Sequence, residues 1–204
     1  NHWRRYLKES LGGTVVAIFG PSGSGKSRQK NIFKKNGWNE IVSYVTRPPR
    51  GESDIEYEFA TEDEWQEEYN RGNLINVNRY GGNFYGTKIS DFRNAGKSIL
   101  VTDITNVDGS RGDEDLNKIA ARENKRLVLL FSAPPEPEEL MRRHKERFDS
   151  GEYDDSEEYE NRLATAGRES VKMWSEIEKL KGLGVVLHTI YNDEDAVRLA
   201  RELA

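Results

Sequence analysis

The sequence predicts an α/β protein in which a parallel central sheet is covered by helices on both faces. Short apolar runs at residues 14–19 (TVVAIF), 98–104 (SILVTDI) and 126–131 (RLVLLF) have the composition of buried strands. Helix-like segments separate these runs, and strands that alternate with helices are typical of a parallel sheet. Ligands bind such sheets at the carboxyl ends of the strands, so the residues that follow each run are candidates for a functional site.

Local signals predict the remaining elements. Thr61 stands three residues before Glu64, which is the spacing of a capping box at the start of a helix. Residues 73–90 are rich in Asn, Gly and aromatic residues and indicate strands and turns. Weaker strand signals lie at residues 41–46 and 185–191, and helix signals lie at residues 27–35, 61–71, 136–148, 156–181 and 193–203.

Composition narrows the function classes. The chain has 204 residues, enough for one domain, and a net charge of -5, which is a poor match to a nucleic-acid backbone. It has no cysteine, which excludes disulfides and thiolate metal sites. No apolar run reaches the length of a membrane span. We therefore expect a soluble cytoplasmic protein without nucleic-acid or membrane partners.

Residues 20–27 (GPSGSGKS) form a phosphate-binding motif. They fit the pattern G-x-x-x-x-G-K-[ST] without a mismatch and stand between a predicted strand and a predicted helix. The glycines let backbone N–H groups converge on phosphate oxygens, Lys26 is expected to reach the β- and γ-phosphates, and the Ser27 hydroxyl to ligate Mg²⁺. The residues expected to bind the donor phosphates are Ser22, Gly23, Ser24, Gly25, Lys26 and Ser27. The motif alone does not choose between kinase, ATPase and GTPase, and a plain Gly-rich turn is the alternative.

A second cationic segment follows at residues 43–52 (SYVTRPPRGE). Arg47 and Arg50 are three residues apart and flank a Pro-Pro pair, which stiffens a fork of guanidinium groups suited to phosphate. Taken alone, the segment is better explained as a solvated loop with two surface arginines. Tyr85 lies between glycines in residues 82–87 (GNFYGT), and Tyr57 precedes Phe59 by two residues, so phenol groups accompany the arginines.

The order of these motifs, from about residue 14 to residue 203, resembles the guanylate kinase family. The resemblance implies a three-layer P-loop kinase fold with a small acceptor-binding subdomain (residues 42–91) and a helical lid (residues 142–165). Residues 14–41, 92–141 and 166–204 would form the core of a single domain, 1–204. In that family Arg47, Arg50, Tyr57 and Tyr85 would hold the acceptor monophosphate. Ser43 and Thr87 would lie against the acceptor base.

The resemblance also assigns residues on the donor side. Arg143 and Arg147 lie four apart on one helix face, and Arg162 lies near the start of the next predicted helix. The family places such arginines in a lid over the triphosphate, where cations stabilise the transferred phosphoryl group. Singly, each is also explained as part of a solvated helix face. Asp103 resembles an aspartate that lies near the phosphates and Mg²⁺, or it forms a turn. Asn192 resembles an adenine-side residue, or it caps the last helix.

The chain departs from the family where guanine is recognised. The family glutamate that accepts from guanine N1–H and its 2-amino group falls on Asn76, and a second acidic contact falls on Thr105. No Asp or Glu occurs between residues 72 and 90. A site that loses such hydrogen bonds loses discrimination. Two readings stay open: an altered base preference, or guanine bound through Ser43, Thr105 and backbone groups.

The sequence therefore predicts an ATP- and Mg²⁺-dependent nucleoside-monophosphate kinase, with GMP or dGMP as the first acceptor. We expect Lys26, Arg47, Arg143, Arg147 and Arg162 to act in catalysis. The chemistry requires no histidine, so the three histidines carry no expected role. The alternatives are a kinase for a non-guanine, deoxy or modified monophosphate, a kinase for a sugar phosphate, and a non-catalytic interaction domain. Small nucleotides are the expected partners, and the chain is expected to be a monomer or homodimer.

Overall fold

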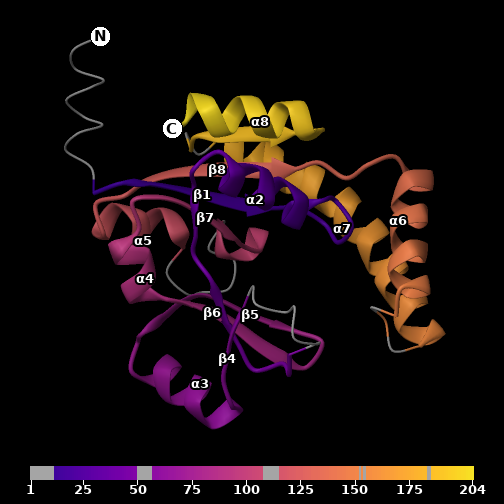
Figure 1. Cartoon of the computed structure of the whole chain (residues 1–204), viewed down its shortest axis with the longest axis horizontal. Helices are drawn as coiled ribbons and strands as arrows, with labels where there is room; N and C mark the ends of the chain where they lie inside the picture. Colours follow the sequence, from indigo (N-terminus) through magenta and orange to yellow (C-terminus); the bar gives the residue numbers. More distant parts are fainter. Residues whose placement is uncertain (1–11, 50–56, 108–114, 152, 154, 183–184) are drawn as a thin grey trace. The chain divides into compact units, whose positions relative to one another are not determined.

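The computed structural model describes residues 12–49, 57–107, 115–151, 153, 155–182 and 185–204 (Figure 1). These residues form two compact units. The first takes its described residues from Asn1–Ala17, Gly37–Val128 and Ala204, and the second consists of Ile18–Asn36 and Leu129–Leu203.

A five-stranded sheet contains the apolar runs seen in the sequence. Its strands have the order β2-β7-β1-β8-β9. The strands are β1 (Thr14–Phe19), β2 (Asn39–Glu40), β7 (Lys97–Val101), β8 (Arg126–Ser132) and β9 (Leu187–Ile190). The pairs β2–β7 and β8–β9 are parallel, and every residue of β1 is buried, as expected for a strand covered on both faces. The prediction of an α/β fold with a parallel central sheet is confirmed.

The first unit also contains a smaller, mixed sheet with the order β4-β3-β6-β5. Its strands are β3 (Ser43–Val45), β4 (Tyr57–Phe59), β5 (Leu74–Tyr80) and β6 (Asn83–Lys88). β3 runs parallel to β4 and antiparallel to β6, and β5 runs antiparallel to β6. The register of β5 against β6 shifts between Ile75 and Asn78, and within this bulge Asn76 has a φ of 53°.

Helix α3 (Glu62–Asn70) covers part of this smaller sheet. The predicted capping box is confirmed, because Thr61 accepts from the Glu64 N–H while the Glu64 side chain accepts from the Thr61 N–H. One turn later Trp65 is buried against Tyr44 and Leu74, and its ring stacks on Phe84 with centroids 5.0 Å apart. Its indole N–H donates to the Tyr44 carbonyl oxygen at 3.3 Å. Trp65 therefore joins the helix to three strands of the sheet.

The described residues of the second unit form the helices α2 (Lys26–Lys35), α6 (Pro137–Asp149), α7 (Ser156–Gly182) and α8 (Asp193–Glu202). α2 packs against α8, and α6 lies beside α7 (Figure 1). Each was predicted to within about two residues, which is the usual uncertainty of helix ends. None of the helices in the described part of the chain combines the length and the apolar composition that a membrane span requires.

The sequence prediction was wrong or silent at several elements of the first unit. The strand predicted to reach residue 104 ends at Val101, and a 3₁₀ turn, η1 (Ile104–Asn106), follows because the Asp103 side chain caps it. The short elements had no periodicity long enough to detect. They are β2, β4, α4 (Ile89–Asn94) and α5 (Leu116–Arg122).

Replacing Trp65 by alanine tests the core of the smaller sheet. The substitution removes the largest side chain of this cluster and an indole hydrogen bond, so we expect the free energy of unfolding to fall by about 3–5 kcal/mol. Tyr69→Ala is the matched control on the same helix, since Tyr69 is exposed and only stacks on Trp65. Its cost should be about 1 kcal/mol. Equal losses for the two variants in urea unfolding would contradict the assignment of Trp65 as the core residue.

Candidate functional site

The phosphate-binding motif forms a tight loop between β1 and α2. Gly20, Gly23 and Gly25 all have positive φ angles, of 159°, 77° and 101°. A Cβ atom at Gly20 would lie 2.5 Å from the Ser132 carbonyl oxygen, and one at Gly23 would lie 2.6 Å from Cδ1 of Leu140. Glycine is therefore required at both positions. Because α2 begins at Lys26, the loop leads directly into a helix N-terminus, where the backbone favours an anion.

Two of the loop's hydrogen-bond donors, Lys26 Nζ and the Ser22 N–H, are bound by oxygens of the protein itself. Lys26 Nζ donates to the carbonyl oxygens of Gly20 and Pro21 at 2.6 and 2.8 Å. The Ser22 N–H donates to Oε2 of Glu169, from α7, at 3.1 Å. A carboxylate oxygen thus occupies one of the loop donors that a phosphate oxygen would use. The sequence offered no signal for Glu169, which is 147 residues away from Ser22.

Arg143 joins α6 to the same loop. Its Nη1 donates to the Gly23 carbonyl oxygen at 3.0 Å, and its Nε donates to Glu139 at 2.7 Å. Hydrogen bonds from Arg142 and from Arg143 lower the pKa of Glu139 to about 2, so this carboxylate stays ionised beside the two guanidinium groups. The structure therefore brings one predicted lid arginine into contact with the predicted phosphate site.

Arg147 and Arg162 converge on the ring of Tyr153. Each guanidinium carbon lies 5.3 Å from the ring centroid. Arg147 comes from α6, Arg162 from α7, and Tyr153 from the connection between them. Arg162 also donates to Oε1 of Glu158 at 2.8 and 2.6 Å. Tyr153 carried no signal in the sequence, because its role comes from the packing of two helices.

His144 lies between the lid residues and the loop. It is fully buried, its Nδ1 shares a 2.7 Å hydrogen bond with the Tyr153 hydroxyl, and a Cβ atom at Gly23 would lie 3.0 Å from its Nε2. Burial, and to a lesser degree the charge of Arg147, lowers the pKa of His144, so the ring is neutral at neutral pH. Nε2 has no hydrogen-bond partner among the described residues.

Two further donor-side predictions differ in outcome. Asn192 caps α8, since its Oδ1 accepts from the Asp195 N–H at 2.9 Å; the proposed contact with the ATP base stays a prediction.

Ser27 is exposed, and no hydrogen bond to a described residue engages its hydroxyl. A hydroxyl with this freedom at the start of α2 fits a ligand of Mg²⁺, which keeps several waters and uses few protein oxygens. The described residues contain no cluster of three or more metal-ligating side chains.

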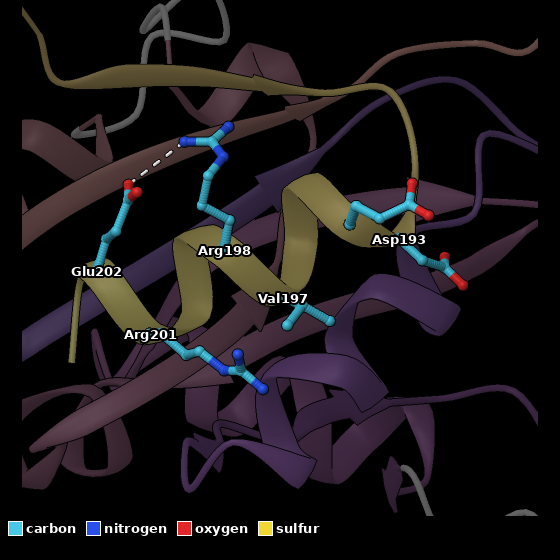
Figure 2. A pocket seen from close by; sticks show the side chains of 6 residues that line it. Asp193, Val197, Arg198, Arg201 and Glu202 are labelled. Carbon is cyan, nitrogen blue, oxygen red and sulfur yellow. Dashed lines mark hydrogen bonds and ion pairs between the residues drawn. The ribbon is translucent and has the colours of Figure 1, made fainter.

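A surface hollow on α8 contains none of the predicted site residues (Figure 2). Its charged side chains point to both sides of the helix, and Arg198 pairs with Glu202 at 3.3 Å. The lining residues are Asp193, Glu194, Val197, Arg198, Arg201 and Glu202. The lining has three acidic and two basic side chains, so its net charge does not favour an anion.

The first unit brings together most of the predicted acceptor residues. Arg47 is only 7% exposed, and its guanidinium carbon lies 4.3 Å from the Tyr57 ring centroid and 5.4 Å from that of Phe59. Ser43 pairs with Tyr57 across β3 and β4, and Tyr85 pairs with Val45 across β6 and β3. The aromatic ring orients the Arg47 fork without neutralising its charge. Arg50 lies outside the described residues.

Asn76 uses its whole amide group inside the protein. Its Nδ2 donates to the Val101 carbonyl oxygen at 3.1 Å and to Thr87 Oγ1 at 3.3 Å. Its Oδ1 accepts from Thr102 Oγ1 at 2.5 Å and from Asn106 Nδ2 at 2.9 Å. These are the two donor and two acceptor positions that an asparagine side chain possesses. Asn76 therefore ties β5 to β6, β7 and η1, and in this arrangement no hydrogen-bonding position is left for a base.

Asp103 and Thr105 lie together after β7. Asp103 Oδ1 accepts from the Thr105 N–H at 2.9 Å and from Thr105 Oγ1 at 2.6 Å. Asp103 therefore forms a turn, which was the alternative to a role near Mg²⁺. Both of these hydrogen bonds use the same carboxylate oxygen, Oδ1. The Thr105 hydroxyl is turned towards Asp103 in this arrangement.

Asn76→Asp tests whether the amide is structural. The change keeps both accepting contacts but sets a carboxylate oxygen against the Val101 carbonyl oxygen, so we expect the free energy of unfolding at pH 7 to fall by about 1–3 kcal/mol. The introduced carboxyl should have a raised pKa in the folded protein, because its neutral form can again donate. The loss should therefore shrink as the pH falls through that pKa.

Asn78→Asp is the matched control for that experiment. Asn78 lies on the same strand, and its side chain makes no hydrogen bond to a described residue. Its substitution should change stability by about 0.5 kcal/mol or less. Urea unfolding at pH 7 and pH 5 compares the two variants, and a similar loss for both would contradict a special role for Asn76.

Comparison with known proteins agrees with this arrangement of motifs. A family model described as guanylate kinase matches residues 12–177. The chain is similar to guanylate kinases of Lactobacillus johnsonii (32% identity, covering 64% of this chain and 64% of the relative) and Wolbachia pipientis (32%, covering 78% and 77%). The match to the Lactobacillus enzyme thus spans slightly less than two thirds of that relative.

A solved structure supports the fold. The crystal structure of guanylate kinase from Anaplasma phagocytophilum aligns with a TM-score of 0.59 at 22% identity, covering 95% of this chain and 85% of that one. The family model extends over most of the sequence. It includes the phosphate-binding loop, the mixed sheet, helix α6 and most of helix α7. The chain belongs to the guanylate kinase family.

Proposed function

We propose that this protein transfers the γ-phosphoryl group of ATP to a nucleoside monophosphate, with GMP or dGMP as the acceptor. The observation that carries the proposal is the complete phosphate-binding loop with Lys26 at the start of α2 and Arg143 bound to Gly23. The names of the relatives support a monophosphate acceptor. Phosphoryl transfer depends mainly on positioning and charge stabilisation, which these residues are suited to supply.

On the donor side, the loop and the arginines would have different roles. The backbone N–H groups of residues 22–25 would hold the β- and γ-phosphates, with Lys26 turning from its carbonyl partners towards the phosphates. Arg143, Arg147 and Arg162 would stabilise charge on the transferred group. Ser27 would hold Mg²⁺, with Asp103 acting through water; the bound ion would neutralise phosphate charge. Asn192 would lie near the adenine.

On the acceptor side, Arg47 and Tyr57 would grip the monophosphate. The guanidinium is already oriented by the two aromatic rings, so little freedom is lost when phosphate binds. Arg50 and Tyr85 would complete the grip, and Ser43 and Thr87 would lie against the base. Since the Asn76 amide is saturated, guanine would be held through Ser43, Thr105 and backbone groups, and Asn76 would contribute indirectly by fixing Thr87.

The intact loop also argues against a purely non-catalytic interaction domain. Such a domain has no need of Lys26, Ser27 and three arginines in the donor region, and each would be free to change.

Cytoplasmic location and a monomeric or homodimeric state stay predictions from the sequence.

An acceptor panel tests the proposed reaction. ADP release from Mg-ATP is measured with GMP, dGMP, AMP, dAMP, CMP, UMP, dTMP and no acceptor. We expect GMP and dGMP to stimulate release above all others. Stimulation by a different monophosphate alone would replace the acceptor in this proposal. ATP binding without stimulation by any acceptor would favour the interaction domain or a kinase for a sugar phosphate.

Lys26→Ala tests the donor site separately. Loss of one preorganised cation at the transferred group should lower kcat about 10²-fold or more. Lys35→Ala is the control, because Lys35 is exposed in the last turn of the same helix. Steady-state kinetics with the preferred acceptor compares the variants. A Lys26→Ala enzyme with nearly unchanged kcat would exclude the proposed role of this lysine.

A further inference from the structure

One side chain, Tyr153, contacts both distal lid arginines and the residue beneath the phosphate-binding loop. It is 4% exposed although it belongs to the connection between α6 and α7. Its ring lies 5.3 Å from the guanidinium carbons of both Arg147 and Arg162, so these two carbons are no farther apart than twice that distance. Its hydroxyl shares a hydrogen bond with His144.

This arrangement overcomes an electrostatic cost. Two guanidinium groups repel each other, and each has enough rotamer freedom to turn into solvent. The electron-rich face of an aromatic ring attracts both cations, more strongly when water is excluded, and does not cancel their charge as a carboxylate would. Arg162 has Glu158 as a counter-ion, but the shared feature of the two arginines is the Tyr153 ring. The Tyr153 ring therefore holds both guanidinium groups in one cluster without adding a negative charge to it.

His144 connects this cluster to the loop. The imidazole and the Tyr153 ring are stacked with an interplanar angle of 28° and centroids 6.0 Å apart, and the hydrogen bond fixes their relative rotation. On its other side, the imidazole contacts the backbone at Gly23, where a Cβ atom would lie 3.0 Å from Nε2 and 3.3 Å from Cδ2. A displacement of Tyr153 is thus opposed by a residue that is itself fixed under the loop.

We propose that Tyr153 is a positioning residue, whose ring orients Arg147 and Arg162 towards the polyphosphate and whose hydroxyl anchors them, through His144, to the phosphate-binding loop. The inference rests on the proposed kinase function and adds to it a residue that touches neither substrate. Because the two arginines would act on the transferred phosphoryl group, we expect a substitution of Tyr153 to lower kcat. Binding of the acceptor, which depends on Arg47 and Tyr57, is unaffected.

Two substitutions separate the ring from the hydroxyl. Tyr153→Leu removes the aromatic face and should lower kcat about tenfold or more, with the acceptor KM changed by about twofold or less. Tyr153→Phe keeps the face and should retain kcat within about threefold. Tyr159→Leu is the matched control, since Tyr159 packs 6.4 Å from Tyr153 in the same aromatic cluster. Urea unfolding of each variant separates a loss of folding from a loss of positioning.

A double-variant cycle identifies the route of the effect. In an Arg147→Ala, Arg162→Ala background, Tyr153→Leu should lower kcat by only about twofold or less, because the groups that it orients are gone. The proposal is overturned if Tyr153→Leu leaves kcat unchanged, if it raises only KM, or if it lowers kcat equally with and without the arginines.

A measurement on the ligand-free protein keeps the inference distinct from the proposed function. Arginine Nε–Hε NMR signals of Arg147 and Arg162 should be displaced by the Tyr153 ring current, and the displacement should persist in Tyr153→Phe and vanish in Tyr153→Leu. Unchanged signals in Tyr153→Leu would reject the inference even if the enzyme is active. A wild-type protein with displaced signals but no kinase activity would reject the proposed function, while the cluster itself would stand.

Discussion

The need to satisfy hydrogen-bond donors around one glycine-rich loop governs the second unit. A loop that points N–H groups and a lysine at a phosphate leaves donors exposed whenever the phosphate is absent, and unpaired donors are costly. Here protein oxygens meet that need: carbonyl groups of the loop bind Lys26, and Glu169 binds the Ser22 N–H. The long helix α7 is thereby tied to the loop, and α6 is tied to it through Arg143.

The first unit is built on a different polar centre. Asn76 stands in a bulge with a positive φ, a conformation that asparagine tolerates better than most residues. Its four hydrogen bonds hold β5 against β6, β7 and η1. The position at which the resemblance to the family places a base-reading carboxylate therefore carries an amide that stabilises the smaller, mixed sheet. Arg47, which lies over the rings of Tyr57 and Phe59, takes part in none of these four hydrogen bonds.

The sequence predicted what depends on neighbouring residues. The apolar run of β1, the glycine spacing of the loop, and the capping box at Thr61 are local patterns with a direct structural meaning. The roles of Glu169 and Tyr153, and those of Thr102 and Asn106 as partners of Asn76, arise from packing, and no local pattern marks them. His144 was assigned no role because histidine has no part in the expected chemistry; its burial under Gly23 became apparent only from the packing of α6 against the loop. Short strands such as β4 are too brief to show alternation.

The contact between Glu169 and the loop changes what nucleotide affinity measures. A phosphate oxygen that takes the Ser22 N–H does not meet a bare donor, since it displaces a carboxylate that returns to water. Association at this donor is an exchange of one anion for another, and its free energy is the difference between two similar interactions. The intrinsic strength of a phosphate contact at this donor would consequently be larger than the observed affinity suggests, because binding would also break the contact with Glu169.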